Sequence, residues 1–438
     1  MNTPRSRISA YGWVMISMLL LLGVINFADK AVLGLAAVPI IKELHLSSAE
    51  YGLVSGSLFW LYALSSMLLT TWSDRIGTKA VLALLAMSWT IVQLATIFVF
   101  SFPALLLTRI MLGAGEGPSY GTSVSAATTW LPEDRRAFGL GIVNFGSAIG
   151  PALFAPPLTF LIVNVGWRSA FVLLGGIGLL WVILWVLIGR DQPDSRPMSV
   201  PEDRAKNSRT RWSEIRPVLF SRTVLFSTFA AFVSYWAVAL YLSWNPVYLV
   251  TVRHLHLSDP LYVAGITLPY VVGGIGFIAC GVLADRLYHR KGSHRQSYVY
   301  VVTAVLIITA LCLYLAVSVP STLLSVIFFT LALIGVGIPL LSTTIVAVAP
   351  ASHRGAILGM YVAVSTLPGL IAPLVTGLII QVAGSNASSG LFYAYLLASL
   401  LLLIGAIAFL AFARPDEDQR VEQSRRMGAQ ARIVQSRP

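Results

Sequence analysis

Twelve apolar segments of about 20 residues or more divide this chain of 438 residues. An α-helix rises 1.5 Å per residue, so about 20 apolar residues cross the roughly 30 Å hydrocarbon core of a bilayer. The segments are 12–37, 50–72, 80–100, 104–130, 138–163, 169–189, 223–250, 261–284, 298–317, 321–349, 356–382 and 390–413. Only 11% of the residues are charged, against about 25% in soluble domains. The pattern predicts an all-α membrane protein with twelve transmembrane helices.

The positions of the basic residues predict how these helices are oriented. If the N-terminus is cytoplasmic, 25 of the 30 Lys and Arg residues fall in cytoplasmic segments. The other five are Lys42, Arg168 and Arg253 on the opposite side, and Lys30 and Arg109 inside helices. Because cytoplasmic loops carry an excess of Lys and Arg, both termini are expected in the cytoplasm. The net charge of +12 then reflects topology and contact with anionic lipids rather than nucleic-acid binding.

A polar stretch at 190–222 separates the first six segments from the last six. The predicted organisation is a helical bundle at 1–189, a cytoplasmic loop at 190–222, a second bundle at 223–413 and a disordered cytoplasmic tail at 414–438. Short motifs recur between the two bundles at similar offsets: Asp74-Arg75 with Asp285-Arg286, and Pro132, Arg136 and Gly141 with Pro350, Arg354 and Gly359. Such repeats predict two pseudo-symmetric six-helix bundles.

Four charged side chains lie inside the predicted helices: Asp29, Lys30, Arg109 and Glu116. A charge at the centre of a membrane helix costs roughly 2.5–3.5 kcal/mol, and charges kept there usually line a pathway or pair with one another. Arg109 and Glu116 are two helical turns apart and therefore share one helix face. Arrival of an anion at one of the cations would change the partner of a carboxylate and its affinity for a proton. The alternative is a static ion network that holds the first bundle together.

The loop after the second predicted helix, Asp74-Arg75-Ile-Gly77-Thr-Lys79, resembles the loop signature of the major facilitator superfamily. A second copy follows the eighth helix, in the stretch from Gly281 to Arg286. The resemblance implies two bundles that rock around a central site, so that each face of the membrane gains access in turn. It assigns a gating role to the loop residues Asp74, Arg75, Asp285 and Arg286.

The first helix carries a more specific motif. Asn26-Phe27-Ala28-Asp29-Lys30 resembles the Asn-Tyr-x-Asp-Arg motif of the anion:cation symporter family. The fourth helix, from Arg109 through Glu116 to Pro118, and the seventh, with Trp244-Asn-Pro246-Val-Tyr248, resemble the same family. The resemblance implies proton-driven uptake of small organic anions, such as sugar acids or aromatic acids, across a cell membrane, here the inner membrane of a bacterium.

The resemblance also implies a role for individual residues. Asp29 and Glu116 would couple protons, Lys30 would meet the substrate carboxylate, and Arg109 would pair with the acidic residues or touch the substrate. Further candidate substrate contacts are polar or aromatic side chains in the helices: Asn26, Tyr62, Tyr241, Trp244, Tyr248 and Thr366. Aromatic residues in membrane helices also serve packing or interfacial anchoring, and that alternative stays open for the four aromatic candidates.

Several positions depart from the family pattern. Lys30 replaces an Arg and so supplies a point charge instead of a planar fork. Phe27 replaces a Tyr, Ser66 a Gln, and Val362 and Thr366 two Asn. Each change removes hydrogen-bonding capacity, so the sequence predicts an anion with fewer hydroxyl groups than a sugar acid, aromatic or short and aliphatic.

Other functional classes are less well supported by the residues. The Gly146-x-x-x-Gly150-Pro151 stretch partly resembles an antiporter motif, which would make the chain an exporter, but the same spacing is typical of helix packing. A sensor built on a transporter fold would need a signalling partner. The sequence has no Walker A, zinc-ligand or nucleophile-elbow signature. We therefore expect no enzyme activity, no cofactor and no metal, and a monomer whose partners are an organic anion, protons and the bilayer.

Overall fold

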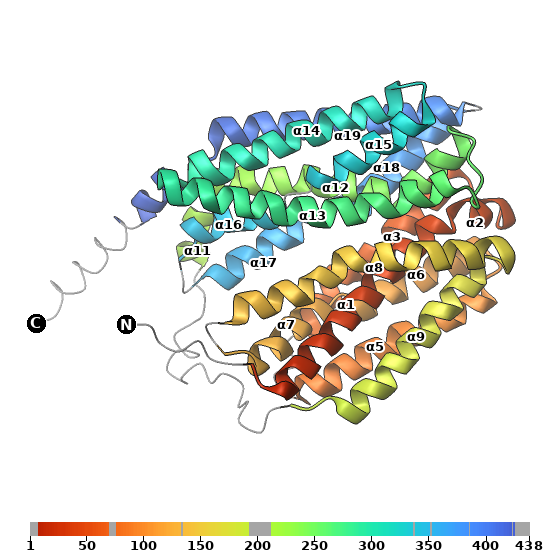
Figure 1. Ribbon diagram of the computed structural model, residues 1–438, viewed down its shortest axis with the longest axis horizontal. Coiled ribbons are helices and arrows are strands. Elements are labelled where there is room, and N and C mark those ends of the chain that lie inside the picture. The colour runs from red at the N-terminus through yellow and green to blue at the C-terminus, as the bar shows by residue number, and fades with distance from the viewer. Residues whose placement is uncertain are drawn as a thin grey trace, which may run out of the picture. The chain divides into compact units, whose positions relative to one another are not determined.

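The computed structural model describes residues 8–69, 76–132, 135–191, 212–335, 338–350, 353–384, 386–422 and 424. Figure 1 shows its helices, coloured along the chain. The first half contains α1 (Ala10–Leu35), α2 (Ala37–Glu43), α3 (Ser48–Leu69), α5 (Thr78–Ala95), η2 (Thr96–Phe98), α6 (Phe102–Glu116), α7 (Ser119–Trp130), α8 (Arg136–Asn164) and α9 (Trp167–Ile188). The second half contains α11 (Trp212–Leu219), α12 (Arg222–Thr251), α13 (Pro260–Lys291), η4 (Arg295–Val299), α14 (Tyr300–Ser318), α15 (Thr322–Ala332), η5 (Leu333–Gly335), α16 (Ile338–Val348), α17 (Arg354–Ser365), α18 (Pro368–Val382) and α19 (Ala387–Phe412).

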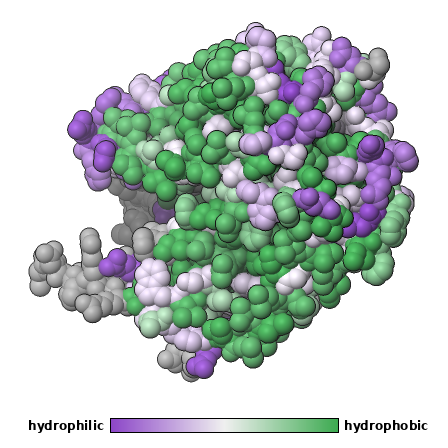
Figure 2. Space-filling view, turned by 45° about the vertical axis from the view of Figure 1, so that its right-hand side comes forward, coloured by the Kyte–Doolittle hydropathy of each residue, from purple (hydrophilic) through white to green (hydrophobic). Residues whose placement is uncertain are grey.

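All twelve predicted segments fall on helical structure. Nine helical stretches of the described chain are long and apolar enough to cross a membrane. The other three predicted spans fall on α3, on the α6–α7 pair and on α15 to α16. Hydrophobic residues cover broad areas of the surface (Figure 2), with Phe160 67% exposed and Leu187 74% exposed. A surface of this kind suits a hydrocarbon solvent, and the prediction of an all-helical membrane protein is confirmed.

The fourth predicted span is broken where the sequence suggested one continuous helix. α6 ends at Glu116, and Gly117 and Pro118 form a turn before α7 begins. Pro118 has no N–H with which to continue the helical ladder, and its ring disfavours helix in the preceding turn. The Ser119 hydroxyl donates to the Glu116 carbonyl oxygen at 2.6 Å. The break therefore places the Glu116 carboxylate at the end of a helix.

The chain forms two compact units, which do not coincide with its two halves. The first unit comprises Met1–Ser199, Ala239–Gly274 and Gly369–Ala394, and the second comprises Val200–Val238, Ile275–Pro368 and Tyr395–Pro438. The predicted division into bundles around 190–222 stays a prediction.

Glycines bring helices of the first unit close together. α1 and α8 lie side by side (Figure 1). A Cβ atom at Gly146 would lie 2.8 Å from the Leu20 carbonyl oxygen, and one at Gly150 only 2.3 Å from that of Val24. Both distances are shorter than real Cβ contacts allow. The packing role predicted for the Gly146-x-x-x-Gly150 spacing is confirmed.

A second close approach joins α3 to α6. A Cβ at Gly113 would lie 1.7 Å from the Leu58 carbonyl oxygen, and one at Gly117 2.1 Å from that of Tyr62. The backbones of the two helices touch because Gly has no side chain to keep them apart. This contact sets Tyr62 of α3 beside the C-terminal end of α6, where Glu116 lies.

The C-terminal segment of the second unit is more ordered than its composition predicted. Residues 415–422 are helical, so the prediction of a disordered tail from Arg414 is wrong for this stretch. The Asp416 carboxylate accepts hydrogen bonds from the His294 N–H at 2.9 Å and the Arg295 N–H at 3.2 Å. Asp418 accepts one from the Thr223 N–H at 2.9 Å. The two carboxylates satisfy free N–H groups at the starts of η4 and α12 and thereby tie the segment down.

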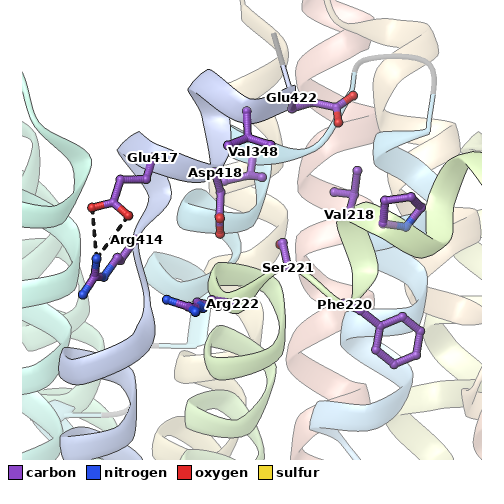
Figure 3. Close-up of a pocket in the computed structure, with 11 residues that line it drawn as sticks. Val218, Phe220, Ser221, Arg222, Val348, Arg414, Glu417, Asp418 and Glu422 are labelled. Atoms are coloured by element: carbon purple, nitrogen blue, oxygen red, sulfur yellow. Dashed lines mark hydrogen bonds and ion pairs between the residues drawn. The ribbon is translucent and has the colours of Figure 1, made fainter. Parts of the chain in front are cut away.

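The same segment lines a cavity of about 360 Å³ in the second unit (Figure 3). Asp418 points toward the first turn of α12, and Glu417 pairs with Arg414 at 3.2 Å (Figure 3). The lining residues are Pro217, Val218, Phe220, Ser221, Arg222, Val348, Arg414, Glu417, Asp418, Val421 and Glu422. None of these was predicted to contact substrate, and Asp418 joins the segment to α12 through the Thr223 N–H.

We expect the Asp416→Asn substitution to lower the stability of the protein by about 0.5–1.5 kcal/mol, because the amide NH₂ group cannot accept the hydrogen bonds that one carboxylate oxygen of Asp416 accepts. Partial burial acts to raise the pKa of Asp416, but hydrogen bonds from Ser293, His294 and Arg295 outweigh it, so the pKa lies below its usual value. The carboxylate therefore stabilises the fold above about pH 4, and this contribution is lost as the pH falls through its lowered pKa.

Thermal unfolding in detergent at a series of pH values tests this expectation. The difference in unfolding temperature between wild type and Asp416→Asn should be constant near neutral pH and should become smaller below about pH 4. Glu417→Gln, which changes an exposed carboxylate of the same segment, serves as the control. An equal effect of the two substitutions would contradict the capping role.

Candidate functional site

Lys30 and Glu116 form an ion pair between α1 and α6. The Lys30 Nζ atom lies 2.7 Å from Glu116 Oε2 and also donates to Asn26 Oδ1, one turn earlier on α1. The Glu116 side chain is fully buried and that of Lys30 is only 8% exposed. Lys30 therefore faces the interior rather than a helix end. Two opposite charges within hydrogen-bonding distance and shielded from water attract each other strongly.

Asp29 and Arg109 are joined through a third residue, Gln93 of α5. The Gln93 Nε2 atom donates to Asp29 Oδ1 at 2.6 Å, and Arg109 Nη2 donates to Gln93 Oε1 at 3.3 Å. Asp29 and Arg109 are each 1% exposed, and Gln93 is fully buried. The adjacent residues Asp29 and Lys30 point in different directions from α1, so each engages a different helix.

Several buried polar atoms of this cluster have no hydrogen-bond partner among the described residues. They are Asp29 Oδ2 and Arg109 Nε and Nη1. Buried polar groups are hydrogen-bonded in the large majority of cases, because an unpaired one costs about 1–3 kcal/mol. A cluster built only to hold helices together would satisfy them. The open donors and acceptors favour a site that receives a ligand or a proton.

Aromatic rings surround the two cations. The Lys30 Nζ atom lies 4.7 Å from the ring centre of Phe27 and 5.4 Å from that of Tyr62. The Arg109 guanidinium lies 5.0 Å from the ring centre of Phe171 on α9. The faces of aromatic rings attract cations at such distances. Tyr62 is thus brought to the predicted site, together with Asn26.

Two of the three aromatic candidates of α12 donate to backbone carbonyl oxygens, and the third lies beside an arginine side chain. Tyr241 donates to the Gly265 carbonyl oxygen at 2.7 Å, and the Trp244 indole N–H donates to that of Pro373 at 3.1 Å. The Tyr248 ring lies 5.5 Å from the Arg253 guanidinium. All three side chains are buried. The contacts of Tyr241 and Trp244 join α12 to α13 and α18. A role of the three residues in substrate binding stays a prediction.

The remaining candidates lie elsewhere in the chain. Thr366, at the break between α17 and α18, belongs to the second unit, and its hydroxyl donates to the Val362 carbonyl oxygen at 2.9 Å. Asp285 is exposed and accepts a hydrogen bond from the Tyr298 hydroxyl at 2.5 Å, and Arg286 is exposed. Asp74 and Arg75 lie outside the described residues. A gating role for these loop residues stays a prediction.

Gln93 is the one member of the cluster that the sequence did not single out. It lies in an apolar helix, 64 residues from Asp29, and a single neutral amide barely lowers the hydropathy of a membrane span. Its position near the middle of the predicted span at 80–100 was the available signal, since polar residues in membrane helices often bind one another.

The described residues contain no group of His, Cys, Asp or Glu that could hold a metal ion.

The sequence matches the model of the Major Facilitator Superfamily over residues 19–373 and again over 294–437. It is 31% identical to the hexuronate transporter of Bacillus subtilis (strain 168), over 91% of this chain and 93% of that protein. It is 29% identical to the probable sulfoacetate transporter SauU of Cupriavidus necator, over 88% of this chain and 90% of that protein. These relatives bear out the resemblance to the anion:cation symporter family that the helix motifs implied.

Solved structures share the fold. A bacterial homologue of the human lysosomal transporter Spinster, in an inward-facing and occupied conformation, superposes with a TM-score of 0.77 at 21% identity, over 94% of this chain and 98% of that one. A D-xylose-proton symporter superposes with a TM-score of 0.75 at 15% identity, over 93% of this chain and 99% of that one. At these identities the likeness concerns the fold alone.

Proposed function

We propose that this chain, a member of the Major Facilitator Superfamily by the match over residues 19–373, imports a small organic anion together with protons. As a member of that superfamily it is a membrane transporter and not an enzyme. The site would face each side of the cell membrane in turn as the two predicted bundles rock around it. The proposal places both termini in the cytoplasm, as the distribution of basic residues predicts.

The buried ion pair between Lys30 and Glu116 carries this proposal. An anion that enters the site needs a cation, and Lys30 has its charge matched by Glu116 at 2.7 Å. When a substrate carboxylate or sulfonate takes the place of Glu116 beside Lys30, the displaced carboxylate is a buried charge without a partner. Taking up a proton removes that charge at less cost than leaving it unpaired. Anion binding and proton binding thus favour each other.

Asp29 and Arg109 supply a second pair of opposite charges in the same cluster. The unpartnered Nε and Nη1 atoms of Arg109 can donate to an anion, and Asp29 Oδ2 can carry a proton. An importer of this kind needs at least one protonatable carboxylate that responds to substrate, and the cluster contains two. We assign Glu116 to the exchange with substrate and Asp29 to a second proton site.

The substrate class follows from the relatives and from the cavity residues. The relatives are named as transporters of hexuronate, sulfoacetate and D-galactonate, all small organic anions. Lys30 and Phe27 offer a point charge and an apolar ring where the family pattern has an Arg and a Tyr. We propose that acids with few hydroxyl groups, such as sulfoacetate or benzoate, are preferred over hexuronates and aldarates.

Uptake into proteoliposomes under an inward proton gradient tests the proposal. The panel would contain a hexuronate, galactonate, glucarate, sulfoacetate and benzoate. We expect Lys30→Ala to raise the KM of the transported acid roughly ten- to hundredfold, the value of one buried charge-assisted hydrogen bond of about 1.5–3 kcal/mol. Lys42→Ala, which removes an exposed lysine, should behave as wild type.

Each result of this experiment has a defined meaning. Gradient-dependent uptake that fails in Lys30→Ala supports an anion importer, and the acid taken up names the substrate. Preferential uptake of aldarates or hexuronates would contradict the predicted preference for few hydroxyl groups. No uptake of any acid, together with proton-driven efflux of neutral or cationic compounds, would contradict the importer and favour an exporter.

A further inference from the structure

We infer that Gln93 is a positioning residue of the proton-coupling site: its side-chain amide joins Asp29 to Arg109 and keeps the two from forming a direct ion pair. The inference rests on the proposed function, because it assumes that Asp29 takes up and releases a proton. It adds a third helix, α5, to the machinery that α1 and α6 provide.

The direction of the amide is set by its two partners. Arg109 has only N–H donors, so the Gln93 carbonyl oxygen must face it, at 3.3 Å. The Gln93 NH₂ group is then directed to Asp29 Oδ1, at 2.6 Å. A carboxylate accepts this bond through an oxygen lone pair, and a protonated carboxyl group also accepts it, more weakly, through its carbonyl oxygen. The bridge therefore fits both protonation states of Asp29.

The proton has a separate place on the same carboxyl group. Asp29 Oδ2 is buried and has no hydrogen-bond partner among the described residues. A proton on Oδ2 leaves the bond between Oδ1 and Gln93 intact. Asp29 can then be protonated and deprotonated without any movement of Arg109, whose guanidinium is also fixed against the Phe171 ring at 5.0 Å.

Removal of the Gln93 side-chain amide would change the contacts of Asp29 and Arg109. The charged groups that face Asp29 are Lys30 on α1 and Arg109 and Glu116 on α6. With an apolar side chain at position 93, Asp29 Oδ1 and Arg109 Nη2 both lose their partner. The cheapest way to satisfy them is a direct contact between the two groups. Such a pair holds Asp29 in its ionised form and opposes protonation.

The Gln93→Leu substitution tests this inference, because leucine fills a similar volume and cannot bridge. A pH difference of one unit supports about tenfold accumulation when one proton moves with each substrate. In Gln93→Leu we expect accumulation to fall below that of wild type, because Asp29 no longer contributes its proton, while exchange of labelled for unlabelled substrate at equal pH persists. The pH profile of that exchange should shift to lower pH. Gln93→Asn, which keeps a shorter amide, should lie between Gln93→Leu and wild type.

Thr90→Val is the matched control. Thr90 lies one turn earlier on α5 and is 1% exposed, and valine has nearly the same shape. It should leave accumulation, exchange and the pH profile as in wild type. If Gln93→Leu keeps the coupling and the pH profile of wild type, or if Thr90→Val alters them as strongly, Gln93 has no positioning role.

The wild-type protein separates this inference from the proposed function. A wild type that accumulates no acid under a proton gradient overturns the proposed function itself. A wild type that accumulates an acid, beside a Gln93→Leu variant that does so equally well, overturns only the role of Gln93.

Discussion

Glu116→Gln is expected to abolish proton-driven accumulation of the substrate. Glutamine keeps the shape of Glu116 and can still accept a hydrogen bond from Lys30, but it carries no charge and takes up no proton. Wild type should concentrate its substrate about tenfold for each pH unit of gradient when one proton is coupled. The variant should reach only the external concentration, because substrate movement no longer depends on the gradient.

Two measurements keep this result apart from misfolding. Exchange of labelled for unlabelled substrate at equal pH should persist in Glu116→Gln, since Lys30 keeps its charge and no longer faces a charged carboxylate at 2.7 Å. Glu43→Gln provides a control at an exposed carboxylate of the same unit, which pairs with Arg168. Accumulation by Glu116→Gln at the wild-type level would show that the proton is carried elsewhere.

A second large effect is expected at the glycines where helices of the first unit touch. A Cβ at Gly34 would lie 1.9 Å from the Leu242 carbonyl oxygen, and one at Gly52 would lie 2.4 Å from that of Pro373. In the proposed alternating-access cycle, these contacts of α1 with α12 and of α3 with α18 would separate in each turn of the cycle. Gly52→Ala disfavours the state in which α3 and α18 touch, by the roughly 1–3 kcal/mol typical of overpacking. We expect uptake to fall about tenfold or more.

Accessibility of the contact region distinguishes a shifted equilibrium from a damaged fold. Ser243 is 6% exposed, and its carbonyl oxygen accepts a hydrogen bond from Tyr51 at 3.0 Å. In a background without the two native cysteines, Ser243→Cys should be alkylated faster by an impermeant thiol reagent when Gly52→Ala is added. Gly176→Ala is the control, because a Cβ there meets nothing within 4 Å. Unchanged uptake and alkylation in Gly52→Ala would mean that the contact does not open.

The helices were predictable because a bilayer requires long apolar segments whose backbone groups are satisfied within the helix. Pro118 alone does not predict the helix break after Glu116, because α8 continues through three prolines. Gly117, next to Pro118, closely approaches the Tyr62 carbonyl oxygen of α3, and a contact between helices so distant in sequence is not visible in the local pattern.

The charged members of the site were predictable and its connections were not. Asp29, Lys30, Arg109 and Glu116 stand out because each is costly inside a membrane. Which carboxylate pairs with which cation depends on how α1, α5 and α6 pack, and that packing is set by helix contacts far apart in the chain. Hydropathy gave no reason to separate Asp29 from Arg109 by the amide of Gln93.

The order of the C-terminal segment likewise depends on contacts between residues distant in the sequence. The stretch around Asp416 is polar and mixed in charge, which is typical of disorder. Its order comes from hydrogen bonds to His294 and Arg295, about 120 residues earlier. The composition of a short segment does not reveal hydrogen-bond partners that lie so far away in the sequence.

Proton movement during transport tests the central claim most directly. Proteoliposomes that contain a pH-sensitive dye would receive the transported acid from outside, with equal pH on both sides and the membrane potential clamped. Proton symport predicts acidification of the lumen that depends on the acid, is absent in Glu116→Gln and is absent in liposomes without protein. Uptake of the acid with no change in lumen pH, or with alkalinisation, would contradict proton symport.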